Sequence, residues 1–302
     1  MKVVLADRTG FCFGVRRAVS MAQSAIKNNG KIYSLGSIIH NAQVVEDLER
    51  KGLKVIKDLA SAKRGEAIVI SSHGISPKIA GKIRRKGLKI IDTTCPFVLN
   101  AQRIANGLAR DGYSAIIVGD ANHPEVKALI DFAPKGAKVV KDRAEAAALD
   151  LGRSTRISVL SQTTQSSENF LDVVKTILQK RPKELKVCNT ICNDAEERQR
   201  LARELASKVG LMLVVGGRHS ANTRRLYEVC RKTLKNTHLI ETGKELERAW
   251  FRSVGSVGIT SGASTPDRAV QQVVSAIGGI LCRKPVRGLK AQILRKGLCH
   301  RW

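Results

Sequence analysis

The sequence predicts an α/β protein in which several small, mainly parallel sheets are flanked by helices. Short β-branched runs alternate with stretches of helical period along the 302 residues. Twelve such runs are too many for one ordinary open sheet, so several smaller sheets are expected. Aromatic residues make up only 4% of the chain, and the core must therefore consist of aliphatic side chains.

The predicted strands are separated by helical stretches of roughly 10–15 residues, which is typical of parallel sheets because parallel strands need crossover connections. The runs are 2–6, 31–35, 53–56, 67–71, 88–92, 115–119, 137–140, 157–161, 185–189, 211–216, 238–241 and 257–260.

Three cysteines divide these strands into groups of about four. Cys12 and Cys95 are 83 residues apart, and Cys95 and Cys192 are 97 residues apart. We therefore expect three similar α/β units arranged pseudo-threefold around a shared centre. Their predicted bounds are 13–95, 96–191, and 192–281 together with 1–12. Residues 282–302, which include seven Lys or Arg and no acid, are predicted to form a basic C-terminal tail.

The formal charge of +27 favours anionic partners, although a solvated basic surface is an equal explanation. No apolar run reaches the ~18 residues of a membrane helix. The N-terminus has a strand pattern instead of an export signal, so we expect a cytoplasmic protein without a membrane partner.

Polar residues gather directly after the predicted strands, where open α/β sheets bind their ligands. His40, His73 and His123 lie at such positions, and so do Ser220, Asn222 and Ser264. Together these side chains can surround a phosphate or diphosphate with donors. No Walker A loop or dinucleotide glycine fingerprint is present, which argues against ATP or NAD.

The seven cysteines form an odd set without regular short spacing, which argues against a disulfide framework in a reducing compartment. Cys12, Cys95 and Cys192 each lie between a strand and a helix. Three thiolates can bind zinc with one open position, or an iron–sulfur cubane with one free iron. Cys188, inside a strand, and Cys230, inside a helix, are expected in the core, and Cys282 and Cys299 are also interpreted as structural.

Glu125 is the carboxylate in these strand-end clusters that is best placed for acid catalysis, because Pro124 holds it close to His123. Thr163 and Thr164 are candidates to orient a substrate hydroxyl or to pass a proton.

The motifs resemble the 4-hydroxy-3-methylbut-2-enyl diphosphate reductase family of the non-mevalonate isoprenoid pathway. They occur in the family's order over most of the chain. They are Gly10-Phe11-Cys12-Phe13-Gly14-Val15-Arg16-Arg17-Ala18, Ser72-His73-Gly74, Asp92-Thr93-Thr94-Cys95-Pro96, His123-Pro124-Glu125-Val126, Ser161-Gln162-Thr163-Thr164, Thr190-Ile191-Cys192 and Gly258-Ile259-Thr260-Ser261-Gly262-Ala263-Ser264.

The resemblance implies a three-unit fold around a [4Fe–4S] cluster, with Cys12, Cys95 and Cys192 as its ligands. It implies an oxidoreductase that removes the substrate hydroxyl at the open iron and forms isopentenyl and dimethylallyl diphosphates. Glu125 and Thr163 would deliver protons. The residues implied to hold the diphosphate are His40, His73, His123, Ser220, Asn222 and Ser264. Electrons would come from a low-potential ferredoxin or flavodoxin.

The chain departs from the family pattern in the predicted diphosphate pocket. Ala221 follows Ser220 where the family usually has a second serine, and Arg218 and His219 are candidates to replace the lost hydroxyl. Asn189 stands where Asp is more frequent before Thr-Ile-Cys.

Two other classes of function remain as alternatives. The same three thiolates are compatible with a zinc hydrolase or lyase that acts on a phosphate ester. The charge of +27 is compatible with nucleic-acid binding, but the basic residues are spread along the chain and few aromatic residues are available for base stacking.

Overall fold

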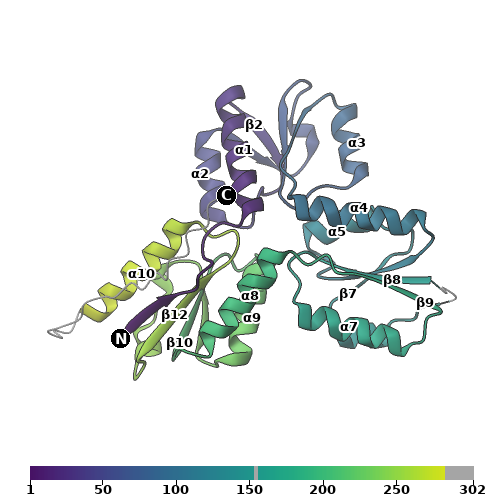
Figure 1. Cartoon of the computed structure of the whole chain (residues 1–302). Coiled ribbons are helices and arrows are strands. Elements are labelled where there is room, and N and C mark those ends of the chain that lie inside the picture. The colour runs from purple at the N-terminus through teal and green to yellow at the C-terminus, as the bar shows by residue number, and fades with distance from the viewer. Residues whose placement is uncertain (153–155, 283–302) are drawn as a thin grey trace, which may run out of the picture. The chain divides into compact units, whose positions relative to one another are not determined.

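Three four-stranded parallel sheets organise the computed structural model, which describes residues 1–152 and 156–282. The first has the order β3-β2-β4-β5, the second β7-β6-β8-β9 and the third β11-β10-β12-β1 (Figure 1). Their strands are β1 (Lys2–Leu5), β2 (Ile32–Leu35), β3 (Leu53–Ile56), β4 (Ala67–Ile70), β5 (Lys89–Asp92), β6 (Ser114–Val118), β7 (Lys138–Val140), β8 (Arg156–Ser161), β9 (Glu184–Cys188), β10 (Leu211–Val215), β11 (Thr237–Ile240) and β12 (Ser256–Ser261).

Ten α-helices lie between the strands or follow the last one within the described residues. They are α1 (Phe13–Asn29), α2 (Ala42–Lys51), α3 (Pro77–Arg85), α4 (Pro96–Arg110), α5 (Pro124–Ile130), α6 (Arg143–Ala148), α7 (Ser167–Gln179), α8 (Asn193–Ala206), α9 (Ala221–Thr233) and α10 (Asp267–Cys282). All twelve predicted strands are confirmed, and no bound differs from its prediction by more than one residue.

The three sheets repeat one topology. In each sheet two central strands pair with each other, as β2 does with β4. The strand next to the second of them, such as β5, lies at an edge. In the third sheet this edge strand is β1, which pairs in parallel with β12. The N-terminus thus supplies an edge strand of the third sheet, in the position that β5 and β9 have in the other two, and the predicted fold class is confirmed.

The chain packs as two compact units. One contains Met1–Cys12 and the described residues from Glu197 onward, and the other contains Phe13–Glu196. The larger unit therefore holds two of the sheets, whereas the three-unit boundaries stay a prediction. Most of the expected basic tail lies outside the described residues.

Several helices begin at defined residues because polar side chains cap them. Ser76, Ser166 and Ser220 each accept a hydrogen bond from a backbone N–H in the first turn of α3, α7 and α9. Proline occupies the first turn of α3, α4 and α5, where its missing N–H costs no hydrogen bond. The helices thereby start immediately after the strand-end loops and fix where those loops end.

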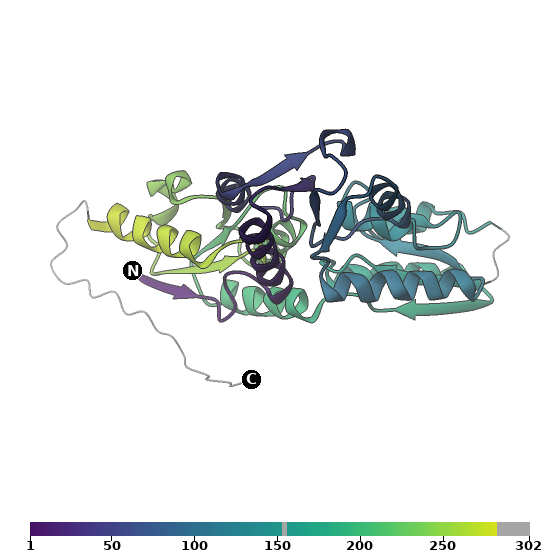
Figure 2. The same cartoon turned by 90° about the horizontal axis from the view of Figure 1, so that it is seen from above.

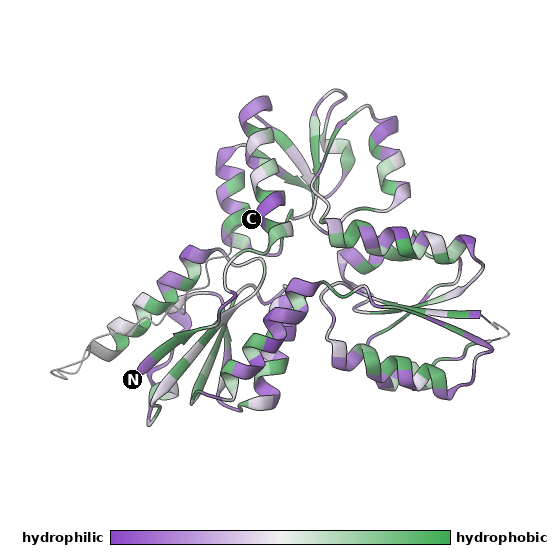
Figure 3. Ribbon diagram, in the orientation of Figure 1, coloured by the Kyte–Doolittle hydropathy of each residue, from purple (hydrophilic) through white to green (hydrophobic). Residues whose placement is uncertain are grey.

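The core lies on both faces of each sheet. In β6, Ile116 and Val118 pack toward α6 and α7, whereas Ile117 packs toward α4 and α5. This alternation follows from the two-residue period of a strand, and helices cover both faces of the sheet (Figures 1 and 2). Figure 3 shows the result, with apolar strands inside and hydrophilic positions on the outer helix surfaces.

We expect Ile117→Ala to lower the free energy of unfolding by about 2–5 kcal/mol, because it leaves a cavity at a fully buried position. Urea denaturation followed by circular dichroism measures this change. An unchanged midpoint would contradict the assignment of Ile117 to a tightly packed core.

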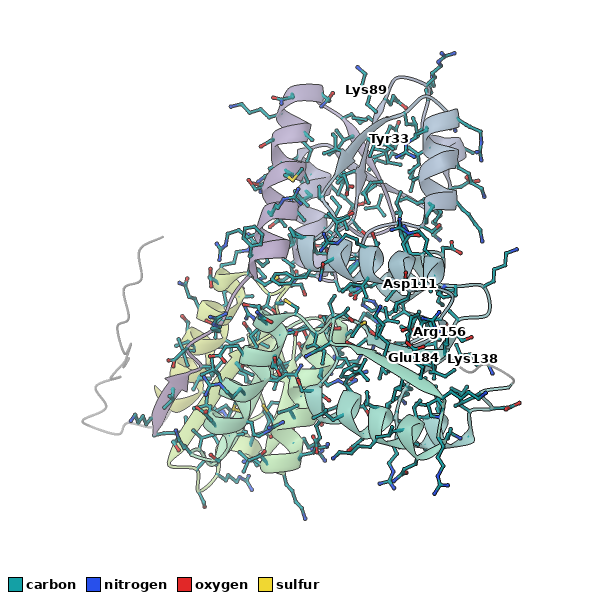
Figure 4. The ribbon with its side chains drawn as sticks, turned by 45° about the vertical axis from the view of Figure 1, so that its right-hand side comes forward. Tyr33, Lys89, Asp111, Lys138, Arg156 and Glu184 are labelled. Carbon is teal, nitrogen blue, oxygen red and sulfur yellow. The ribbon has the colours of Figure 1, made fainter. Side chains whose placement is uncertain are left out.

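Exposed ion pairs lie near the amino ends of the strands in the second sheet. Arg156 contacts Glu184 at 2.8 Å (Figure 4). Lys186 contacts Asp111 at 3.3 Å. Such exposed pairs contribute at most about 1 kcal/mol each. The buried polar groups lie at the opposite, carboxyl ends of the strands. No helix among the described residues is long and apolar enough to cross a membrane.

Candidate functional site

Cys95 and Cys192, both in the larger unit, lie at the starts of helices. Cys95 is the N-cap residue of α4 and Cys192 directly precedes α8. Burial raises the pKa of both thiols, while backbone N–H groups in the first turn of each helix act in the opposite direction. Those amides can stabilise a thiolate, as helix N-termini do for other anions.

All three predicted ligand cysteines are fixed by the same backbone contact. The Cys95 N–H donates to the carbonyl of Ser72 at 3.0 Å, and the Cys192 N–H to that of Thr163 at 2.8 Å. In the smaller unit, the Cys12 N–H donates to Ala263 at 3.0 Å. In each case an edge-strand loop is bound to the loop after the neighbouring strand. The repeated topology thus places each thiol beside a loop with predicted site residues.

Asn189 is one departure from the family pattern. It stabilises the turn before Cys192 through the same kind of contact that Asp92 makes before Cys95. Its Oδ1 accepts the Ile191 N–H at 3.0 Å, as Asp92 Oδ1 accepts the Thr94 N–H at 2.9 Å before Cys95. Because an amide oxygen accepts as well as a carboxylate oxygen does, the loop geometry does not need the charge of Asp.

His40, His73 and His123 converge within the larger unit. The ring centroids of His40 and His73 are 4.5 Å apart, and each lies 5.3 Å from that of His123. Burial, together with the two neighbouring rings, lowers the pKa of His73 well below its usual range. The predicted histidine cluster is therefore present, with nitrogens within 4.8 Å of one another.

The bonding of His123 indicates what this cluster can bind. His123 caps α5, and its Nδ1 accepts the Glu125 N–H at 3.2 Å. A neutral imidazole whose Nδ1 accepts carries its proton on Nε2, so Nε2 is a donor. A metal ion would instead need the Nε2 lone pair. The cap contact therefore favours an anion over a metal ion at the three rings.

Glu125 and Thr163 form a buried pair. Thr163 donates its backbone N–H to Glu125 Oε1 at 2.7 Å and its hydroxyl to Oε2 at 2.8 Å. Burial raises the pKa of Glu125 to about 7, although both hydrogen bonds from Thr163 act to lower it. Since Thr163 also accepts the Cys192 N–H, the pair is bound to the loop of a predicted ligand. A carboxyl with this pKa can give up a proton near neutral pH.

Ser220, Asn222 and Ser264 are buried in the smaller unit. Ser220 caps α9, and its Oγ accepts the Thr223 N–H at 3.3 Å, which leaves its hydroxyl proton available. Both amide atoms of Asn222 are buried without a hydrogen-bond partner among the residues that the structure describes. Such a group costs roughly 1–3 kcal/mol, which a bound ligand would recover.

Ala221 stands where the family pattern has a second serine, and the contacts of Arg218 are with other residues. The Arg218 guanidinium bonds to Glu245, and its backbone N–H donates to Glu241 Oε1 at 2.7 Å. Its side chain is 56% exposed. The sequence-based suggestion that Arg218 compensates is therefore not supported by its contacts.

Two further residues lie next to the site and were not predicted as site residues. Arg17 donates from Nη1 to the carbonyl of Thr94 at 3.1 Å, and its charge acts to lower the pKa of Cys95. Gln102, on α4, is buried with its Nε2 against Gly74, the residue after His73. Only the twin arginines of the first motif offered a signal for Arg17, whereas Gln102 depends on which face of α4 is buried.

Cys188 and Cys230, two of the cysteines interpreted as structural, have structural surroundings, whereas the side chain of Cys282 and all of Cys299 lie outside the described residues. Cys188 ends β9 and packs against the core between that sheet and α4. Burial raises the pKa of the Cys230 thiol to about 12. His238 stacks on Trp250 with ring centroids 3.8 Å apart.

Fold and site together define a class of proteins: repeated parallel α/β sheets with thiols and buried polar side chains at the carboxyl ends of their strands. The LytB protein family model matches residues 3–278. The chain belongs to this family.

Named relatives are similar over nearly the whole chain. A 4-hydroxy-3-methylbut-2-enyl diphosphate reductase of Pelobacter propionicus is 46% identical over 280 residues, which cover 93% of this chain and 99% of that protein. One from Dehalococcoides mccartyi is 42% identical over 284 residues, covering 93% and 99%.

Two solved structures are also similar. The (E)-4-hydroxy-3-methyl-but-2-enyl diphosphate reductase described as the terminal enzyme of the non-mevalonate pathway is 40% identical, with a TM-score of 0.65 over 92% of this chain and all of that one. The E-1-hydroxy-2-methyl-but-2-enyl-4-diphosphate reductase from Plasmodium falciparum is 27% identical, with a TM-score of 0.88 over all of this chain and 94% of that one.

Proposed function

We propose that this chain reduces 4-hydroxy-3-methylbut-2-enyl diphosphate to isopentenyl and dimethylallyl diphosphates. The observation that carries the proposal is the buried Glu125–Thr163 pair, bound to the loop of Cys192 in a chain that is similar to such reductases over 93% of its length. The overall reaction consumes two electrons and two protons and releases the hydroxyl as water.

We propose a [4Fe–4S] cluster as the cofactor, with Cys12, Cys95 and Cys192 as ligands. The donor set fits, since each thiol follows an edge strand, precedes a helix and is only partly buried. Three thiolates leave one iron of a cubane without a protein ligand. Such a cluster supplies a Lewis-acidic iron and a path for electrons.

The protein would bind the substrate through its diphosphate. His40, His73 and His123 would donate from the larger unit, with His123 donating from Nε2. Ser220, Asn222 and Ser264 would donate from the smaller unit. Diphosphate oxygens accept strongly, because they are charged. Fixing this end of the substrate orients the alcohol and lowers the entropic cost of reaching the reactive geometry.

Glu125 would supply the proton that leaves with the hydroxyl. Hydroxide is a poor leaving group, so protonation of the oxygen is needed as the C–O bond breaks. Thr163 would hold the carboxyl in place and relay a proton through its hydroxyl. The pKa of about 7 keeps a large share of Glu125 protonated at neutral pH.

We propose an acidic, low-potential ferredoxin or flavodoxin as electron donor and a cytoplasmic location. The formal charge of +27 supports the first idea, because a basic surface attracts an acidic carrier.

Two alternatives are less well supported. A zinc hydrolase would use the same thiols, but no observation favours hydrolysis, and the His123 cap contact favours an anion at the histidines. For nucleic-acid binding, the buried strand-end donors offer no advantage, because stacking of bases needs exposed aromatic residues.

Anaerobic turnover of the hydroxylated butenyl diphosphate with an artificial reductant tests the proposal directly. Purified full-length protein should form both products, and its iron and sulfide contents should rise together. Zinc at one equivalent without iron, or iron-loaded protein that forms neither product, would overturn the proposal.

We expect Asn222→Ala to weaken diphosphate binding without destabilising the fold. The change removes two buried polar atoms that have no partner in the described structure, so no folded-state hydrogen bond is lost. The KM should rise about 10- to 100-fold, which corresponds to one lost hydrogen bond to a charged group. The melting temperature should stay equal or increase.

Steady-state kinetics and calorimetric titration with inorganic pyrophosphate measure these effects. Asn236→Ala is the matched control, because Asn236 Nδ2 donates to Gly210 on the exposed surface of the same unit. An Asn222→Ala protein that melts several degrees lower with an unchanged KM would show that Asn222 has a structural role instead.

A further inference from the structure

The segment before Cys12 is joined to the loop that contains Ser264. The Gly10 N–H donates to Ser261 Oγ at 2.9 Å, and the Cys12 N–H donates to the Ala263 carbonyl at 3.0 Å. Two short segments from opposite ends of the sequence thus lie against each other. One contains a proposed cluster ligand and the other a proposed diphosphate donor.

Gly10 is needed at this junction for two reasons. Its φ of +79° lies in the left-handed region, which favours glycine. A Cβ at this position would also collide with the carboxylate of Asp267, at the start of α10. The Cys12 segment therefore fits closely against the β12–α10 loop.

Arg198 lies at the same junction. It is on α8 but belongs to the smaller unit, where it is only 3% exposed. Its Nη1 donates both to the Arg8 carbonyl at 3.3 Å and to the Ser261 carbonyl at 3.5 Å. A single nitrogen therefore links the Cys12 segment to the β12 end. Because a buried charge is costly unless it is bonded, the guanidinium resists separation of the two carbonyls.

We propose that Arg198 is a positioning residue that holds the Cys12 segment and the Ser264 loop as one block. It acts through the carbonyls of Arg8 and Ser261. The significance of the block rests on the proposed function, since that function gives Cys12 and Ser264 their roles. With Arg198 in place, a proposed cluster ligand and a proposed substrate donor keep a fixed separation.

Hydrogen–deuterium exchange of the full chain without bound metal or substrate tests the proposal. In Arg198→Met, we expect the peptide that covers residues 8–14 to exchange about tenfold faster than in the wild type, because the local opening free energy falls by about one charged hydrogen bond. The peptide that covers β10, in the core of the same unit, should exchange at its wild-type rate.

Two variants sharpen this test. Arg198→Lys keeps the charge and should restore part of the protection of residues 8–14. Arg200→Met is the matched control on the same helix, because Arg200 is exposed and pairs with Glu197 and Glu204 on the surface. It should leave the exchange of both peptides unchanged.

Equal acceleration of the β10 peptide would overturn the proposal, because it would indicate general destabilisation. Unchanged exchange of residues 8–14 in Arg198→Met would overturn it as well. If Arg198→Met does not fold, Arg198→Lys decides: the peptide of residues 8–14 must exchange faster than in the wild type while β10 does not. The measurement needs no iron and no substrate, so its failure is distinct from failure of the proposed reductase activity.

Discussion

Cys192→Ser, purified and reconstituted anaerobically, should retain only a small fraction of the iron bound by the wild type. The wild type should bind about four iron and four sulfide per chain. A serine hydroxyl is a poor substitute for thiolate, because it is seldom ionised at neutral pH and is a harder donor. With two thiolates remaining, we expect the visible absorption of the cluster to fall at least tenfold, and activity to fall with it.

Cys188→Ser is the matched control for this variant. Cys188 is four positions earlier in the same segment, but it ends β9 and packs against core residues. Its iron content should therefore equal that of the wild type. Iron analysis, sulfide analysis and electron paramagnetic resonance of the reduced protein distinguish the two variants. Equal iron loss in both would contradict the assignment of Cys192 as the third ligand, and full iron content in Cys192→Ser would exclude it.

The order of the strands and the positions of the cysteines were predictable from local sequence. Each strand is a short aliphatic run that ends at polar residues, so its bounds depend on local pattern. The return of β1 to the last sheet was also predictable, because residues 192–281 together with 1–12 form a third segment about as long as those between Cys12, Cys95 and Cys192. These features depend on the positions of residues along the sequence, which can be read without knowledge of tertiary contacts.

The contacts that define the site were not predictable, because they depend on tertiary structure. Nothing in the sequence indicates that Glu125 N–H donates to Nδ1 of His123, or that this contact makes Nε2 a donor. The common N–H contact of the three cysteine loops likewise depends on which strands are neighbours. Arg198 resembles any helical arginine in the sequence, and only its burial separates it from exposed Arg200.

Glu125→Gln should keep its cluster and lose most of its turnover. Glutamine preserves the size of the side chain and can still accept from the Thr163 N–H, but it cannot supply a proton. We expect the rate to fall about 10²- to 10⁴-fold, the usual contribution of a general acid. In the wild type, kcat/KM should decrease as pH rises through about 7, where Glu125 loses its proton. The variant should lack this decrease.

Stability provides a second measurement of the same carboxyl, without iron or substrate. Burial raises its pKa from 4.5 to about 7, so the folded state holds the proton more tightly than the unfolded state does. The stability gained from the protonated form is complete below pH 4.5 and is lost as pH rises through 7. Relative to Glu125→Gln, the wild type should therefore lose about 3 kcal/mol of unfolding free energy between pH 4.5 and 8. Urea denaturation at both pH values measures this difference, and parallel stability curves for the two proteins would refute a raised pKa at Glu125.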